Sequence, residues 1–220
     1  MTASVPTREQ VSVLIPAAGI GGRLGMGPKA SLPLHGRPVI EWILDKATQV
    51  GAEVLVAIAP GCTLAAPATA VAGGATRQES IERLTAAATR PWCLLWDAAN
   101  PFASVALARR VLAAAAGTGA AAACVPAVVP WLEIEGERVL RAHPAAGSGS
   151  ISMPHAYATS LLREVTGRAT RAGWVASSTI ELMLMAGQEV TCVTGERLNI
   201  KLTTPEDWQL AQALLAQLQS

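Results

Sequence analysis

The sequence predicts an α/β fold in which a mostly parallel β-sheet is covered by helices on both faces. Short runs rich in valine, isoleucine, leucine and cysteine recur along the chain, and each is apolar throughout, as strands buried on both faces are. Stretches with helical periodicity separate these runs, an order typical of parallel sheets. The 220 residues, of which 51% are hydrophobic, suffice for a sizeable core, so we expect one domain over residues 1–220.

Strands and helices alternate along most of the chain. Strands are predicted at residues 11–15, 53–59, 92–96, 121–128 and 189–194. Helices are predicted at residues 39–50, 76–89, 104–116, 154–165, 177–186 and 205–217. Thr76 and Glu79 have the spacing of a capping box, and Pro205 suits the first position of a helix.

One segment interrupts this alternation. Residues 129–142 have the pattern of a β-hairpin with Gly136 near its turn. A hairpin that leaves an α/β domain usually serves dimerisation or covers a site, so we expect a protruding arm here.

Composition and local pattern exclude several classes of protein. A net charge of +1 provides no basic face for nucleic acid. Residues 111–131 have the length of a membrane span, but glycines and prolines interrupt them, which predicts a helix end, a turn and a buried strand. The N-terminal segment lacks the apolar core of a signal peptide. No two of the four cysteines have CxxC spacing, so we expect buried free thiols in a protein from a reducing compartment. We therefore expect a cytoplasmic protein with no membrane contact.

The loop after the first strand, PAAGIGGRLGMGPK (residues 16–29), has the composition of an anion-binding site. Its glycines allow successive backbone N–H groups to converge on an anion, and Arg23 and Lys29 add charge that suits phosphate oxygens. The loop matches neither the P-loop pattern nor a GxGxxG that opens directly into a helix. Taken alone, it also fits a glycine-rich turn with two solvated cations.

Asp97 follows the predicted strand 92–96 directly. A carboxylate at the carboxyl end of a parallel strand lies on the same edge of the sheet as the glycine-rich loop, where it could hold Mg²⁺ against nucleotide phosphates. A turn or N-cap aspartate would have the same sequence context.

Two other stretches contain residues that local structure does not require. In GGATRQESIERL (residues 73–84), helix capping explains Thr76 but not Gly74, Arg77 or Ser80. Lys201 is one of only three lysines in the chain, and the helix start that follows it does not explain it either.

Four stretches together resemble one known family. PAAGIGGRLGMGPK, GGATRQESIERL, WDAANPF and NIKLTTPEDW occur in this order and look like the motifs of the 2-C-methyl-D-erythritol 4-phosphate cytidylyltransferases of the non-mevalonate isoprenoid pathway, a pattern that ribitol-5-phosphate cytidylyltransferases share. The resemblance covers nearly the whole chain. It implies a Rossmann-like nucleotidyltransferase domain that forms a homodimer through the β-arm. It also implies Mg²⁺-dependent transfer of CMP from CTP to a small phosphate-bearing acceptor, with release of pyrophosphate.

The resemblance assigns roles by position. Arg23, Lys29 and Lys201 would be catalytic, because they would hold the triphosphate and the reacting phosphates, and Asp97 would bind Mg²⁺. The residues that would bind the nucleotide are Pro16, Ala17, Ala18, Gly19, Gly21, Gly22, Gly74, Arg77 and Ser80. The residues that would bind the acceptor are Asn100, Arg141 and His155, with Arg110 as a further candidate.

The chain departs from the family pattern mainly on the acceptor side. Asn100 replaces an arginine that faces the substrate phosphate in the family, and Ala75 replaces an acidic or polar residue. The family's DTxK element is missing, and its TPQ and TDDA elements appear as MPH (153–155) and ASST (176–179). Because the nucleotide elements persist, we expect a phosphate or phosphonate acceptor other than methylerythritol phosphate. The alternatives are a non-catalytic nucleotide-binding or regulatory paralogue, the isoprenoid enzyme itself, and an enzyme that uses another nucleoside triphosphate.

Overall fold

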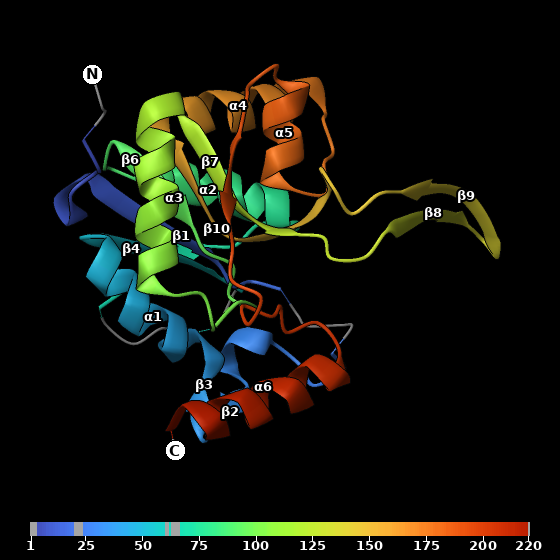
Figure 1. Cartoon of the computed structure of the whole chain (residues 1–220). Coiled ribbons are helices and arrows are strands. Elements are labelled where there is room, and N and C mark those ends of the chain that lie inside the picture. Colours follow the sequence, from blue (N-terminus) through green and yellow to red (C-terminus); the bar gives the residue numbers. More distant parts are fainter. Residues whose placement is uncertain (1–3, 20–23, 60–61, 63–66, 220) are drawn as a thin grey trace.

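The computed structural model describes residues 4–19, 24–59, 62 and 67–219, and its main feature is a seven-stranded sheet (Figure 1). The strands are β1 (Val11–Pro16), β4 (Glu53–Ile58), β5 (Thr69–Ala72), β6 (Trp92–Leu95), β7 (Ala120–Pro126), β10 (Gly149–Ala158) and β11 (Thr191–Thr194). Their order across the sheet is β11-β7-β10-β6-β1-β4-β5. Neighbouring strands are parallel except where β10 pairs with β6 and β7. The predicted α/β fold with a mostly parallel sheet is confirmed.

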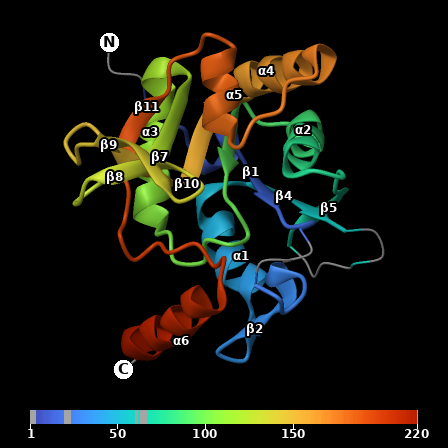
Figure 2. The ribbon, with the colours of Figure 1, turned by 90° about the vertical axis from the view of Figure 1, so that its right-hand side faces the viewer.

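Helices cover both faces of this sheet (Figure 2). They are α1 (Val39–Val50), α2 (Arg77–Ala87), α3 (Val105–Thr118), α4 (Thr159–Ala172) and α5 (Thr179–Met185). The C-terminal helix α6 (Pro205–Gln219) lies apart from the large sheet, and short 3-10 helices occur at Arg8–Gln10 and Lys29–Ser31. Val13 and Ile15 of β1 belong to one buried cluster with side chains of α1 and α3, whereas Leu14 belongs to a second cluster with side chains of α2, α4 and α5. Successive residues of a strand point to opposite faces, so the continuous apolar run of β1 follows from a helical layer on each side.

The predicted starts of α2 and α3 agree closely with the structure. Thr76 accepts a hydrogen bond from the Glu79 N–H, and Ser104 accepts one from the Leu107 N–H, so these side chains cap α2 and α3. Helix α3 ends before Gly119, whose φ of 87° is left-handed, and the buried strand β7 begins at the next residue. Residues 111–131 therefore form the predicted helix end, turn and strand. No helix in the described part of the chain is long and apolar enough to cross a membrane.

The predicted helix over residues 154–165 is wrong at its beginning, because residues 154–158 belong to β10. The proline suggested a helix start. It lies instead where the register between β10 and β7 shifts, between Ile151 and His155, and a strand tolerates a residue without an N–H at such an irregularity. Tyr157 and Ala156 are fully buried on opposite faces of this inner strand. Helix α4 begins only at Thr159.

Two other expectations need correction. The edge strand β5 is not in the prediction, because its sequence TAVA is short, largely exposed and lacks a run of large apolar side chains. The cysteines are not all buried. Cys93 is buried, but Cys62 and Cys192 are exposed.

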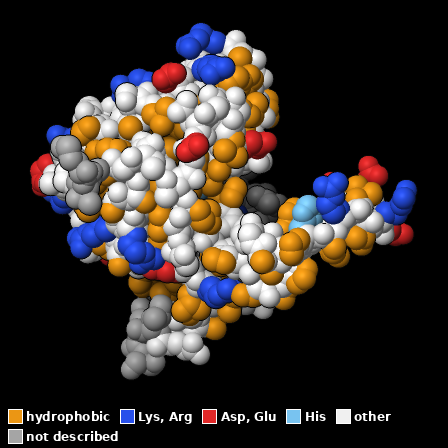
Figure 3. Space-filling view, turned by 45° about the horizontal axis from the view of Figure 1, so that its top comes forward, with side chains coloured by type: hydrophobic (Ala, Val, Ile, Leu, Met, Phe, Trp, Pro, Cys, Tyr) orange, Lys and Arg blue, Asp and Glu red, His pale blue; other side chains and the backbone are white. Residues whose placement is uncertain are grey.

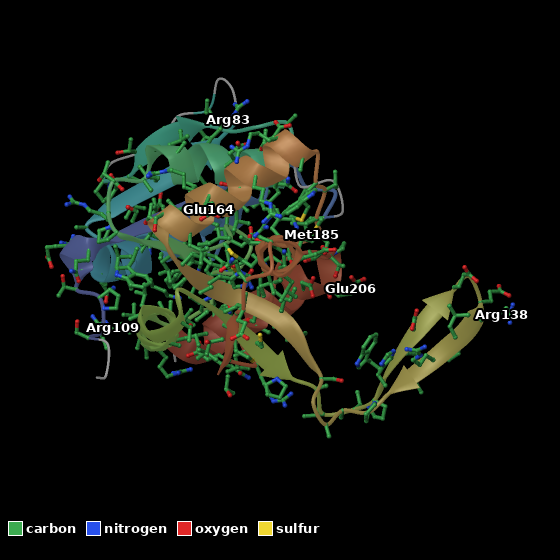
Figure 4. The ribbon with its side chains drawn as sticks, turned by 90° about the horizontal axis from the view of Figure 1, so that it is seen from above. Arg83, Arg109, Arg138, Glu164, Met185 and Glu206 are labelled. Atoms are coloured by element: carbon green, nitrogen blue, oxygen red, sulfur yellow. The ribbon has the colours of Figure 1, made fainter. Side chains whose placement is uncertain are left out.

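The predicted hairpin is present as β8 (Trp131–Glu135) and β9 (Arg138–His143), joined through Gly136 with a φ of 58°. It extends far from the sheet (Figure 1), and Arg138 lies near its tip (Figure 4). Hydrophobic side chains gather along it (Figure 3). Every residue of β8 is exposed, so the prediction of a protruding arm is confirmed.

A small second sheet joins the segment after the glycine-rich loop to the C-terminal helix. It consists of β2 (Pro33–Leu34) and β3 (Arg37–Pro38). Leu34 is fully buried in the same cluster as Trp208 and Leu215 of α6, and a ring nitrogen of His35 lies 2.8 Å from the Gln212 carbonyl oxygen. These contacts fix the end of the loop that carries Lys29.

Candidate active site

A pocket of about 280 Å³ lies at the carboxyl ends of β1 and β6, beside the N-terminus of α2. It is lined by Pro16, Ala17, Ala18, Gly19, Lys29, Ala30, Gly74, Ala75, Thr76, Arg77, Ser80, Asp97, Ala98, Ala99 and Lys201. Open α/β sheets bind ligands outside the carboxyl ends of their strands. The pocket brings together all the predicted catalytic, nucleotide-binding and metal-binding residues that the structure describes. Gly21, Gly22 and Arg23 lie outside the described residues.

Close backbone contacts shape one wall of this pocket. The Ala17 N–H donates to the Ala57 carbonyl oxygen at 2.9 Å, and the Gly73 N–H donates to the Ile58 carbonyl oxygen at 2.8 Å. A Cβ atom added to Gly73 would lie only 2.3 Å from the Cβ of Ala18. Gly73 thus allows the segment after β5 to lie directly against a residue that lines the pocket.

Replacing Gly73 with alanine is expected to displace Ala18 and weaken nucleotide binding, with a loss of about 1–3 kcal/mol in the free energy of unfolding from the enforced overlap. Gly117→Ala is the matched control. Its added Cβ meets nothing within 4 Å inside α3, so it should stabilise the fold by about 0.5–1 kcal/mol. Nucleotide titration and chemical denaturation measure both effects. Unchanged affinity in Gly73→Ala would contradict this account of the wall.

The start of α2 and the turn before it also line the pocket. The Ser80 hydroxyl donates to the Thr76 carbonyl oxygen at 2.9 Å and accepts from the Gly74 N–H at 3.0 Å. Glu79 extends the cap, because its carboxylate accepts from the Ala75 N–H at 2.8 Å. These bonds hold the turn before α2 in place, and the helix N-terminus directs partial positive charge toward the pocket.

Asp97 connects two cations that come from distant parts of the sequence. Its Oδ2 lies 3.2 Å from Lys201 Nζ and 3.5 Å from Arg77 Nε. The Asp97 side chain is only 10% exposed, whereas that of Lys201 is 50% exposed. The carboxylate therefore holds both cations at the rim of the pocket, and Lys201 remains accessible to a ligand. The turn interpretation of Asp97 also applies, since its carbonyl oxygen accepts from the Asn100 N–H at 3.0 Å.

Lys29 joins the glycine-rich loop to the segment that contains Lys201. Its Nζ donates to the Leu202 carbonyl oxygen at 2.6 Å. Among the described residues, the pocket thus combines Lys29, Lys201 and Arg77 with a single lining carboxylate, Asp97. This surplus of positive charge suits a polyanionic ligand such as a triphosphate.

The predicted acceptor residues are not brought together in this chain. Asn100 lines a second pocket that shares Lys201 with the first. His155 is 1% exposed within β10, between the Ser152 carbonyl oxygen and the Tyr157 hydroxyl, so it lines neither pocket. Arg141 lies on the arm in register with Glu133, and Arg110 bonds the Thr194 carbonyl oxygen from α3.

The second pocket also contains residues that the sequence analysis did not select. They are Val125, Ser150, Ile151, Ser152, Met153, Glu196, Arg197 and Asn199. Asn199 could have been identified from the sequence, because it lies two residues before Lys201 in the NIKLTTPEDW stretch. The misassigned start of residues 154–165 concealed the contribution of β10.

His155 makes the stability of the fold sensitive to mild acid. Complete burial lowers the pKa of its imidazole to about 4, against the opposing effect of the Ser152 carbonyl oxygen. In the unfolded chain the pKa is about 6.5, so between about pH 6.5 and 4 the unfolded state binds a proton that the native state does not. As the pH is lowered from 6.5 to 4, the free energy of unfolding should fall by about 3 kcal/mol. Above pH 6.5, His155 should make no contribution to the pH dependence of stability. Denaturation of the native chain and of His155→Gln at several pH values isolates this contribution. Equal pH dependence in both would contradict it.

Comparison with known proteins agrees with this geometry. A family model described as 2-C-methyl-D-erythritol 4-phosphate cytidylyltransferase matches residues 11–217. The chain belongs to this family. A member from Thermus thermophilus is 44% identical over 207 residues, which are 93% of this chain and 97% of the relative. A member from Deinococcus radiodurans is 35% identical and covers 97% of this chain and 93% of its own length.

Solved structures of the family have the same fold. The crystal structure of the Thermus thermophilus cytidylyltransferase superimposes with a TM-score of 0.83 at 40% identity and covers 93% of this chain and 98% of that one. The Anaerococcus prevotii structure has the same TM-score at 23% identity, with 94% and 96% covered, and supports the fold alone. The match to the family extends through the arm and most of the C-terminal helix, because it includes residues 11–217.

Proposed function

We propose that this chain is a cytidylyltransferase that transfers CMP from CTP to a small polyol phosphate and releases pyrophosphate. The observation that carries the proposal is the first pocket, in which Lys29, Lys201 and Arg77 converge at the carboxyl ends of parallel strands in a member of this family. The same convergence argues against a non-catalytic paralogue, since charged residues from four separate stretches line one pocket.

The reaction depends on alignment of the reacting phosphates and neutralisation of their charge more than on a general base. An oxygen of the acceptor phosphate forms a bond to the α-phosphorus of CTP while the bond from that phosphorus to the pyrophosphate oxygen breaks. Because the acceptor phosphate is already an anion, no proton must be removed from it. Lys29 and Lys201 would hold the phosphates in line and offset the charge that develops on the departing pyrophosphate.

Asp97 is the residue that fits a magnesium ion. Mg²⁺ in nucleotide sites is usually held by one or two carboxylates together with substrate phosphates, and Asp97 is the one carboxylate among the described residues that line the first pocket. The described residues contain no cluster of three or more potential metal ligands, so the ion would depend on the nucleotide for most of its coordination. When bound, it would neutralise phosphate charge.

The family name makes 2-C-methyl-D-erythritol 4-phosphate the first acceptor to test. A different phosphate or phosphonate acceptor is the second candidate, and the observation that favours it is Asn100. This neutral residue stands in the pocket next to Lys201, where the family places an arginine. The high identity to relatives named for methylerythritol phosphate weighs against this second candidate.

Nucleotide choice is tested by thermal-shift titration with CTP, UTP, GTP and ATP, each with and without Mg²⁺. A ligand that binds only the native state stabilises it by about 2.7 kcal/mol at a hundredfold excess over its Kd. The proposal requires the largest shift with CTP and a further gain with Mg²⁺. Absence of any shift would remove its basis.

We also propose that the arm forms a homodimer, as the resemblance implies. Ile134 and Val139 are 59% and 57% exposed on paired strands, and Trp131, Leu132 and Leu140 are also exposed. Several exposed apolar side chains on one extended hairpin favour burial against another protein surface. Sedimentation should show a dimer for the native chain and a monomer for the Ile134→Asp, Val139→Asp double variant, with an unchanged melting transition of the core. A native chain that sediments as a monomer would contradict the proposal.

A further inference from the structure

Lys201 lies in an irregular stretch of chain. Strand β11 ends at Thr194 and α6 begins at Pro205, and we call the residues between them the 195–204 segment. The Lys201 side chain is 50% exposed and lines both the nucleotide pocket and the second pocket. A group at a reacting centre must be held closely, since a displacement of about 1 Å can cost about 10²-fold in rate. The position of this lysine therefore depends on the contacts that the 195–204 segment makes with the rest of the molecule.

Asn199 attaches this segment to the large sheet. It is 6% exposed, and its Nδ2 donates to the Met153 carbonyl oxygen at 2.7 Å and to the Ser152 hydroxyl at 3.2 Å. Both acceptors belong to β10, which lies between β6 and β7 in the interior of the sheet. A side-chain amide has two N–H donors, so both donors of Asn199 are directed at an inner strand.

The irregularity in β10 explains why an amide is suited to this position. Ser152 and Met153 fall within the register shift between β10 and β7, where the regular pairing is interrupted. Met153 is 5% exposed, so its carbonyl oxygen needs a partner from elsewhere in the chain. An apolar side chain in place of Asn199 would leave that oxygen unpaired. Because hydrogen bonds are directional, the amide also fixes where the 195–204 segment lies along β10.

The same segment is joined to the turn that begins at Asp97. The Asn199 carbonyl oxygen lies 3.5 Å from Asn100 Nδ2. The Leu202 N–H donates to the Ala99 carbonyl oxygen at 2.8 Å. These two contacts lie on either side of the lysine in the sequence. Together with the bonds to β10, they determine where the lysine lies relative to the Asp97 carboxylate.

We propose that Asn199 is a positioning residue, which holds Lys201 where the two pockets meet and 3.2 Å from Asp97. The inference rests on the proposed function, in which Lys201 acts on the reacting phosphates. Asn199 acts through Lys201, because its own side-chain N–H groups are both bonded to β10. Its loss should therefore impair the chemical step more than nucleotide binding.

Asn199→Ala is expected to lower kcat by about 10- to 100-fold, the cost of a misplaced group at a reacting centre. The Kd for CTP should change far less, because Lys29 and Arg77 still line the nucleotide pocket. Steady-state pyrophosphate release, with the acceptor that supports it, and calorimetric titration with CTP measure the two effects. Weaker binding of CTP with an unchanged kcat would overturn the inference.

A double-mutant cycle separates positioning from a general loss of structure. If Asn199 acts through Lys201, Asn199→Ala should have little further effect on kcat in Lys201→Ala. Independent losses at the two sites would instead multiply, and that result would overturn the inference.

Ser152→Ala provides the milder variant for the same cycle should Asn199→Ala not fold. It removes only the 3.2 Å contact and leaves the bond to the Met153 carbonyl oxygen in place. We expect kcat to fall by about 2- to 10-fold, as for loss of one hydrogen bond, and this loss should be absent in Lys201→Ala. A loss of equal size with and without Lys201 would overturn the inference.

Ser12→Ala is the matched control for the loss of two buried hydrogen bonds. Ser12 is fully buried, and its hydroxyl donates to the Glu53 carboxylate and accepts from the Arg90 N–H at 3.2 Å. It lies near the amino end of β1 and lines neither pocket. Chemical denaturation should show a loss of stability in this variant, with kcat per folded molecule unchanged. A loss of kcat equal to that of Asn199→Ala would overturn the inference.

A crystal structure of Asn199→Ala tests the inference without turnover. The 195–204 segment should move away from β10, and the distance between Lys201 Nζ and Asp97 should increase by about 1 Å or more. An unchanged position of Lys201 would overturn the inference. A displaced Lys201, in a protein whose native form releases no pyrophosphate with any acceptor, would instead contradict the proposed function.

Discussion

Replacing Lys29 with alanine is expected to lower kcat by about 10²- to 10³-fold, the usual cost of removing a positioned charge or donor at a reacting centre, while the fold remains intact. Lys29 lines the nucleotide pocket, and its Nζ lies 2.6 Å from the Leu202 carbonyl oxygen beside Lys201. The side chain is only half-buried, and the core of the sheet does not depend on it. Steady-state pyrophosphate release and a melting curve measure the two effects. The sequence predicts a loss of the same kind for Arg23→Ala.

Lys46→Ala is the control for the loss of a lysine. Lys46 also donates through Nζ to a backbone oxygen, that of Pro101 at 2.6 Å, but it does not line the nucleotide pocket. Burial lowers its pKa, so the variant should change stability more than turnover per folded molecule. If Lys29→Ala and Lys46→Ala retained similar turnover, the result would contradict the assignment of Lys29 and the glycine-rich loop to triphosphate binding.

Asp97→Asn has the second large expected effect. The amide keeps the shape of the side chain but removes the charge that holds Lys201 and Arg77 within 3.2 and 3.5 Å. It also removes the carboxylate proposed for Mg²⁺. We expect kcat to fall by about 10²-fold or more and half-maximal activity to require a higher Mg²⁺ concentration.

Asp45→Asn provides the comparison for Asp97→Asn. Asp45 pairs with Arg37 at 2.7 Å on the surface of α1, outside the nucleotide pocket. An exposed pair contributes at most about 1 kcal/mol, so activity and its Mg²⁺ dependence should match those of the native chain. An Asp97→Asn enzyme with native Mg²⁺ dependence would exclude Asp97 as the metal ligand.

Much of the nucleotide pocket could be predicted because its residues lie in strand-to-helix loops. Pro16 and Asp97 directly follow apolar runs, and parallel strands bring such loops to one edge of the sheet. Local rules therefore placed Lys29 and Asp97 at one edge of the sheet without knowledge of the order of the strands, whereas the role of Gly74 came from the family resemblance.

The acceptor side was harder to predict because it depends on β10. This strand contains Pro154, and its antiparallel place between β6 and β7 leaves little trace in local sequence. His155 was therefore predicted to bind a ligand, whereas its position in an inner strand buries it completely. Arg197 and Asn199 lie in an irregular segment, where periodicity gives no information about which side chains meet.

The most direct test of the proposed function is pyrophosphate release from CTP by the native chain with Mg²⁺ and 2-C-methyl-D-erythritol 4-phosphate, alongside ribitol 5-phosphate and a set of other phosphates and phosphonates. We expect release that requires both CTP and a polyol monophosphate, with formation of the matching cytidine diphosphate polyol. Release with no member of the set, although the chain is folded and binds CTP, would contradict it and restore the non-catalytic alternative.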